Sequence, residues 1–166
     1  MDPLLDEKIV VTLLRSIPEY LMNTLRIHAV KEAYGPSRNE GICYESCSAI
    51  GFSGELNGTL YYCMDGYTKL KMLPRIAEMF HVDPGQRGMA ESVLLEFGNQ
   101  MAATVVQELQ DGGFQVQLEP PENLSHKMIP VDLERYRQYI LIFFLRDRRD
   151  RDYYGRAYLL LTIKKF

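Results

Sequence analysis

The sequence predicts an α/β (α+β) protein in which a mostly antiparallel sheet carries long helices. Two long segments, Leu4–Leu25 and Met89–Gln110, have apolar residues at helical spacing. Two pairs of strand-like segments are each separated by a short connection, which is typical of antiparallel hairpins. A chain of 166 residues can bury a sizeable core, so we expect a single domain over residues 1–166.

The first half of the chain predicts a helix, a strand and a hairpin. Leu4–Leu25 contains Pro18, so we expect a kink there or two helices that meet. Arg26–Tyr34 alternates like a strand, and residues 35–39 form a predicted loop. Ile42–Phe52 and Leu56–Met64 are the strands of the predicted hairpin.

The turn of this first hairpin has two competing signals. Ser53-Gly54-Glu55 is the preferred turn, because Asn57-Gly58 would leave the second strand without a partner of matching length. A β-bulge at Gly58 would reconcile the two signals.

The second half predicts two helices and a longer hairpin. Tyr67–Phe80 is helical, and Met89–Gln110 ends firmly at Gly112-Gly113. Phe114–Leu118 is a short strand, and residues 120–123 form a loop. The final hairpin, residues 139–146 and 153–164, is apolar on both faces, so we expect both sides of the sheet to be covered.

The connection within the final hairpin, Arg146–Asp152, alternates positive and negative charges. Two interpretations remain open for this loop. It is either a solvated loop that keeps the hairpin soluble, or a docking loop for an acidic partner.

Composition and charge narrow the class of protein. Hydrophobic residues make up 46% and charged residues 25%, as in ordinary globular proteins, and the net charge of -3 does not suggest nucleic-acid binding. The longest apolar run, Ile140–Leu145, is far shorter than the roughly 18 residues of a membrane span, and no secretory signal is recognisable. We therefore expect a cytoplasmic protein that binds neither nucleic acid nor membrane.

The cysteines and histidines give no sign of a metal site or a disulfide. Cys43, Cys47 and Cys63 are odd in number, which suggests free thiols in a reducing compartment. Cys43 and Cys47 would lie about 13 Å apart along a strand, too far for a disulfide. No pair has zinc-finger spacing, so we expect no metal and no cofactor on this chain.

The outer face of the Met89–Gln110 helix is unusual because it is polar but nearly uncharged. It carries Glu96 as its one formal charge, with Asn99 one turn further on and the small residue Ala103 nearby. Such a face fits either an ordinary exposed helix surface or a site that another surface approaches closely. Ser92 and Gln100 lie on the same face.

Two segments resemble a known family. Ala90–Ala102 is similar to the signature helix of the CheX branch of the CheC–CheX–FliY phosphatases, which act on chemotaxis response regulators. Ile50–Leu60 is similar to the glycine-bearing hairpin that precedes that helix, and Tyr158–Ile163 is similar to the end of the closing hairpin. The resemblance covers nearly the whole chain, from about Leu4 to Lys165. It departs from the family pattern at Ala102-Ala103, where members commonly have Ala-Gly.

The resemblance implies an enzyme with one Glu-x-x-Asn site, formed here by Glu96 and Asn99. Its substrate would be a phosphorylated CheY-like receiver that brings its own Mg²⁺. Asn99 would orient the attacking water and Glu96 would pair with a receiver Lys, with Ser92, Gln100 and Ala103 as partner-binding residues. The resemblance also implies a homodimer joined through sheet edges. The alternative is a catalytically inactive CheX-like module that binds a receiver or serves as a structural dimer.

Overall fold

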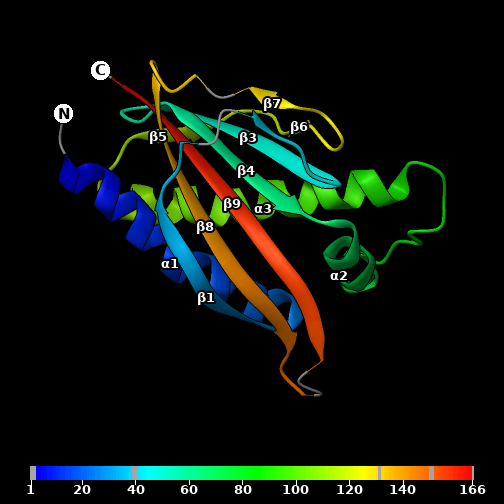
Figure 1. Ribbon diagram of the computed structural model, residues 1–166. Helices are drawn as coiled ribbons and strands as arrows, with labels where there is room; N and C mark the ends of the chain where they lie inside the picture. The colour runs from blue at the N-terminus through cyan, green and yellow to red at the C-terminus, as the bar shows by residue number, and fades with distance from the viewer. Residues whose placement is uncertain (1–2, 39–40, 131, 150–151, 166) are drawn as a thin grey trace.

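The computed structural model describes residues 3–38, 41–130, 132–149 and 152–165 (Figure 1). The helices are α1 (Pro3–Leu25), α2 (Gly66–Met79) and α3 (Met89–Asp111). The strands are β1 (Ile27–Pro36), β2 (Gly41–Ile42), β3 (Ser46–Gly54), β4 (Gly58–Met64), β5 (Val116–Leu118), β6 (Glu122–Asn123), β7 (Ile129–Pro130), β8 (Tyr136–Asp147) and β9 (Tyr153–Lys164).

The large sheet has the strand order β1-β8-β9-β4-β3-β5, with β6 also paired to β3, and its pairings are antiparallel. In Figure 1, α1 and α3 lie behind this sheet and α2 lies at one end of it. A separate two-stranded sheet pairs β2 with β7. The predicted fold class, a mostly antiparallel sheet that carries long helices, is confirmed.

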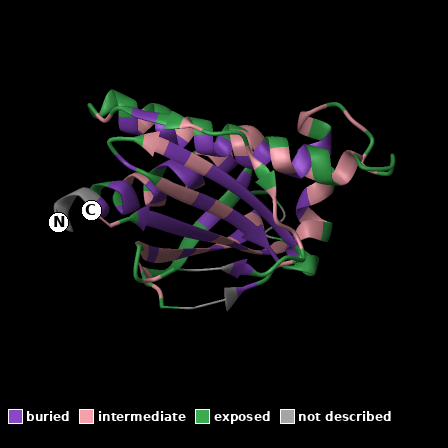
Figure 2. Cartoon of the chain, turned by 90° about the horizontal axis from the view of Figure 1, so that it is seen from above, coloured by how far each residue is buried: buried purple, intermediate pink, exposed green. Residues whose placement is uncertain are grey.

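Two hydrophobic clusters cover the two faces of the large sheet. The larger cluster lies between the sheet and the three helices. The smaller one joins Ile42 and Ile129 of the β2–β7 pair to Cys47, Cys63 and Leu160. Figure 2 shows the buried residues concentrated along the strands of the large sheet.

The prediction that both faces of the final hairpin are covered is right only for part of it. Leu160 of β9 is completely buried under the β2–β7 pair. Ile142 and Phe144 of β8 remain half-exposed on the same face. Ile140 of β8 packs against the smaller cluster, whereas Ile142 and Phe144, further along the strand, do not belong to it.

The structure corrects the predictions for α1 and β1. α1 is one helix through Pro18, so the alternative of two helices meeting there is wrong. β1 continues through Gly35 and Pro36, which were predicted as loop residues, and Pro36 pairs with Tyr139. Because β1 is an edge strand, proline's missing N–H costs no ladder hydrogen bond on its open side.

The first hairpin differs from the prediction in its start and in its turn. Its first strand begins at Ser46, because Ile42 pairs with Ile129 instead. The connection consists of residues 55–57, which overlap both turn signals but include neither Gly54 nor Gly58. The Asn57 side-chain amide donates to the Gly54 carbonyl at 3.2 Å. The β3–β4 register has no shift, so the predicted bulge at Gly58 is wrong. A Cβ at Gly58 would lie 1.9 Å from the Thr162 carbonyl oxygen, which explains the glycine without a bulge.

The remaining elements agree closely with the predictions. α2 starts one residue earlier than expected because Asp65 caps it, accepting a hydrogen bond from the Thr68 N–H at 2.8 Å. α3 matches its predicted range to within one residue. The predicted strand at 114–118 shortens to β5, and the predicted loop at 120–123 contains the short strand β6.

Candidate functional site

α3 is fixed on the sheet by one fully apolar side. Phe97 and Met101 are completely buried, and between them Gly98 lies directly against β3. A Cβ at Gly98 would come within 3.0 Å of the Ser48 Cβ, so the absence of a side chain allows this close packing. The opposite side of the helix, which carries Glu96 and Asn99, is therefore held outward.

The five residues predicted for the site lie on one face of α3. Ser92, Glu96, Gln100 and Ala103 are exposed, and Asn99 is half-buried. Their spacing of three or four residues places them along successive turns of the helix. The structure thus brings together the residues that the sequence analysis selected.

Glu96 and Asn99 differ in how they are held. The Gln100 side-chain amide donates to Glu96 Oε1 at 3.2 Å, so Gln100 orients this carboxylate in the free protein. Within the part of the chain that the structure describes, the Asn99 carboxamide has no hydrogen-bond partner. Its donor and acceptor are thus available to water or to another molecule.

Tyr20 of α1 is a neighbour of the site that sequence reasoning did not identify. Its ring centroid lies 5.5 Å from that of Phe97, and its hydroxyl is buried without a partner among the described residues. Burial raises the pKa of Tyr20 to about 12, and the Glu96 carboxylate adds to this shift. No local sequence signal marks Tyr20, because only the packing of α1 against α3 brings it there.

The cysteines lie apart from this face. Cys47 and Cys63 are directly opposite each other on β3 and β4, with 3.1 Å between their sulfurs, and both are buried. Burial raises the pKa of the Cys63 thiol, so it stays protonated at neutral pH. Cys43 is exposed, and all three cysteines are free thiols.

Among the described residues, no group of three or more His, Cys, Asp or Glu side chains could hold a metal ion. None of the described helices is both long and apolar enough to cross a membrane.

Comparison with solved structures shows a shared fold. CheX from Desulfovibrio desulfuricans superposes with a TM-score of 0.74 and 12% identity, covering 95% of this chain and 99% of that one. A CheC-like superfamily protein from Shewanella sp. PV-4 superposes with a TM-score of 0.74 and 15% identity, covering 99% of this chain and 100% of that one. CheX in a CheX–CheY–BeF3–Mg²⁺ complex from Borrelia burgdorferi superposes with a TM-score of 0.67 and 17% identity, covering 95% of this chain and 98% of that one.

The family of this chain follows from its sequence rather than from these distant structures. No curated protein matches the chain. The profile of the family described as chemotaxis phosphatase CheX matches residues 46–145, which is more than half of the chain and includes Glu96 and Asn99. The chain therefore belongs to the CheX family of chemotaxis phosphatases.

Proposed function

We propose that this protein hydrolyses the phosphoaspartate of a CheY-like receiver and that Glu96 and Asn99 form its active site. The observation that carries the proposal is their placement one helical turn apart on the outward face of α3. Within the described residues the Asn99 carboxamide is unbonded, as a water-orienting group should be before its partner arrives. The Borrelia burgdorferi CheX, which shares this fold, is bound to a CheY.

Asn99 has the chemistry needed to orient water. Hydrolysis of an acyl phosphate depends mostly on placing water in line with phosphorus and on stabilising charge that is already present. A carboxamide can hold that water through one donor and one acceptor without being a strong base. The receiver would supply the Mg²⁺, so the proposed reaction needs no metal ligand from this chain.

Glu96 would bind rather than react. An exposed carboxylate one turn from Asn99 can form a charge-assisted pair with a receiver Lys near the phosphoryl group. That pair would fix the register of α3 against the receiver and thereby place Asn99. Ser92, Gln100 and Ala103 would contact the receiver around it, with Ala103 allowing close approach because of its small side chain.

The direct test is the lifetime of a phosphorylated receiver. A receiver from the same genome is phosphorylated with a small-molecule donor, and phosphate loss is followed with and without this protein. Wild type should accelerate the loss, and Asn99→Ala should lower the acceleration by roughly 10²–10³-fold. Gln107→Ala is a matched control, since it removes an exposed carboxamide on the same helix whose bond is to Asp111.

The same assay separates the enzyme from the inactive binding module. If wild type binds the phosphorylated receiver but leaves its lifetime unchanged, the binding module is the better description. If Asn99→Ala and Gln107→Ala keep full activity, the reaction takes place elsewhere on the chain.

We also propose that the protein forms a homodimer through a sheet edge. Within the described residues the large sheet ends at β1 and β5. Val30 of β1 is 39% exposed and pairs with the half-exposed Phe144, and Ile142 lies beside them. Light scattering at micromolar concentration should show a dimer that Val30→Lys weakens, whereas a wild-type monomer would contradict the proposal.

A further inference from the structure

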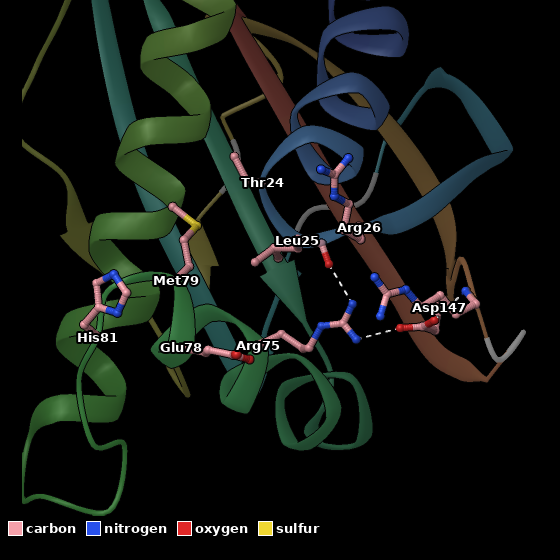
Figure 3. Close-up of a pocket in the computed structure, with 9 residues that line it drawn as sticks. Thr24, Leu25, Arg26, Arg75, Glu78, Met79, His81 and Asp147 are labelled. Carbon is pink, nitrogen blue, oxygen red and sulfur yellow. Dashed lines mark hydrogen bonds and ion pairs between the residues drawn. The ribbon is translucent and has the colours of Figure 1, made fainter.

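A cavity of about 620 Å³ lies where α1, α2 and the end of β8 meet (Figure 3). No residue of α3 lines it, so it is separate from the Glu96–Asn99 face. Its volume is within the range of small-molecule sites, about 300–1,000 Å³. The lining residues are Thr24, Leu25, Arg26, Arg75, Glu78, Met79, His81, Asp147 and Arg149.

Arg75, one of the arginines in this cavity, already has hydrogen-bond partners within the protein. Arg75 donates to the Asp147 carboxylate at 2.6 Å and to the Leu25 carbonyl at 2.7 Å, as Figure 3 shows. The other Asp147 oxygen accepts from the Arg149 backbone N–H, also at 2.6 Å. Asp147 is 5% exposed, and both of its carboxylate oxygens accept hydrogen bonds, so its charge is already compensated within the protein.

Three other arginines form no ion pair with any carboxylate among the described residues. Arg26 and Arg149 line the main cavity, and together with Arg148 they line an adjoining cavity of about 350 Å³. Among the residues that the structure describes, none of their guanidinium groups is in an ion pair. Among the described lining residues Glu78 and Asp147 are the carboxylates, so arginines outnumber carboxylates there although the chain as a whole carries -3.

The backbone holds these arginines together. The Arg148 N–H donates to the Arg26 carbonyl at 3.4 Å, which joins the end of α1 to the end of β8. The Arg149 bond to Asp147 fixes the next residue. Residues far apart in the sequence are thereby brought to one place before any ligand binds, which lowers the entropic cost of binding.

A second, independent observation is the backbone conformation of Arg26 and His81, which both line the cavity. Each follows the end of a helix in a left-handed conformation, with φ of 59° and 56°, where glycine is the usual residue. A basic side chain there also suits the negative end of the helix dipole. The dipole, however, does not account for Arg148 and Arg149, which belong to the other side of the cavity.

We propose that this cavity binds the phosphate groups of a small organic phosphate of nucleotide size. Guanidinium groups match phosphate oxygens in paired hydrogen bonds, and three of them without an ion pair among the described residues suit more than one phosphate group. Leu25 and Met79 supply an apolar wall for the organic part of the ligand.

The test measures binding of ATP, pyrophosphate and adenosine by calorimetry to the full chain. ATP and pyrophosphate should bind saturably at one site, more weakly as salt is raised, and adenosine should not. The double variant Arg26→Asn/Arg149→Gln should weaken ATP binding by roughly tenfold or more. Asn tolerates the left-handed conformation of residue 26, and the Arg149 backbone bond remains in the variant.

Arg87→Gln is the matched control, because Arg87 is exposed and lines neither cavity. Its ATP affinity should stay within about twofold of wild type. Absence of saturable binding by both phosphate probes, equal binding of adenosine and ATP, or an equal loss in Arg87→Gln would overturn the proposal. If neither probe binds and the double variant instead loses affinity for an acidic protein partner, the arginines form a protein-docking surface. Unchanged circular dichroism and melting temperature ensure that these outcomes concern binding.

Discussion

Two carboxylates of this protein, Asp6 and Glu96, have opposite surroundings. Asp6 is 5% exposed and accepts bonds from Arg137 and from the Tyr139 hydroxyl, including 2.8 Å from Arg137 Nη2. Glu96 is exposed, and within the described residues its one hydrogen bond comes from Gln100 on the same helix. The Asp6 contacts join α1 to β8, whereas the hydrogen bond of Glu96 joins two residues of α3. Burial and partners, not residue type, separate a structural carboxylate from one available for function.

The largest effect on stability should come from Asp6→Ala. Removing it leaves the Arg137 guanidinium, whose side chain is 13% exposed, without its counter-charge. The free energy of unfolding should fall by about 3–5 kcal/mol, measured by urea denaturation. Glu32→Ala is the control, because the Glu32–Arg156 pair is exposed and its removal should change stability little. An equal fall in the free energy of unfolding in both variants would contradict the conclusion that burial makes the Asp6 ion pair the more important one for stability.

Glu96→Ala should affect partner binding rather than stability. Its removal should cost on the order of 2 kcal/mol of affinity for a phosphorylated receiver, measured by calorimetry, because one half of a charge-assisted contact is lost. Raised salt should weaken wild-type binding in the same direction. Glu96→Gln should fall between wild type and Glu96→Ala, since it keeps shape and an acceptor.

The opposite pattern would reverse the roles assigned to the two residues. Normal binding with slow turnover in Glu96→Ala, together with lost binding in Asn99→Ala, would make Asn99 the docking residue. A large fall in the unfolding free energy of Glu96→Ala would instead give Glu96 a structural role like that of Asp6.

The elements predicted well are those whose signals are local. α3 has an unbroken helical period and two glycines at its end, so its range followed from the sequence alone. The β8–β9 hairpin has long apolar strands around a charged loop, and its existence was equally clear. In both cases neighbours along the chain decide the structure.

The parts that sequence reasoning missed depend on contacts between distant residues. Ile42 leaves the first hairpin because it pairs with Ile129, which no local pattern shows. A turn centred on Gly54 would have placed Cys47 opposite Tyr61, whereas the later turn places it opposite Cys63. Because the two registers differ by two residues, each side chain of the hairpin stays on the same face of the sheet in both.

The candidate site shows the same division. Helical spacing could predict that Ser92, Glu96, Asn99, Gln100 and Ala103 share a face, and the structure places them together. Their proposed roles came from family resemblance, since an exposed Glu and Asn on a helix have no unique chemistry. The neighbour Tyr20 depends on helix packing, so the sequence offered no way to identify it.

In its burial Tyr20 lies between the buried Asp6 and the exposed Glu96. It is half-buried, and its hydroxyl has no hydrogen-bond partner among the described residues. Tyr20→Phe should keep the Phe97 contact and leave the unfolding free energy at neutral pH equal to or slightly above that of wild type. A clear loss of stability would mean that the hydroxyl has a structural partner, such as an ordered water.

The pH dependence of Tyr20→Phe should give the smallest effect. The pKa of Tyr20 is raised from 10.0 to about 12 in the folded protein, so the unfolded chain loses this proton first. Stability should therefore be fully present below pH 10 and fall as the pH rises from 10 to about 12. Tyr20→Phe should make this fall shallower without removing it, because the pKa values of Tyr44 and Tyr139 are also raised to about 12. Urea denaturation across this range measures the slope, and identical slopes in wild type and variant would show that Glu96 and burial do not act on Tyr20 as described.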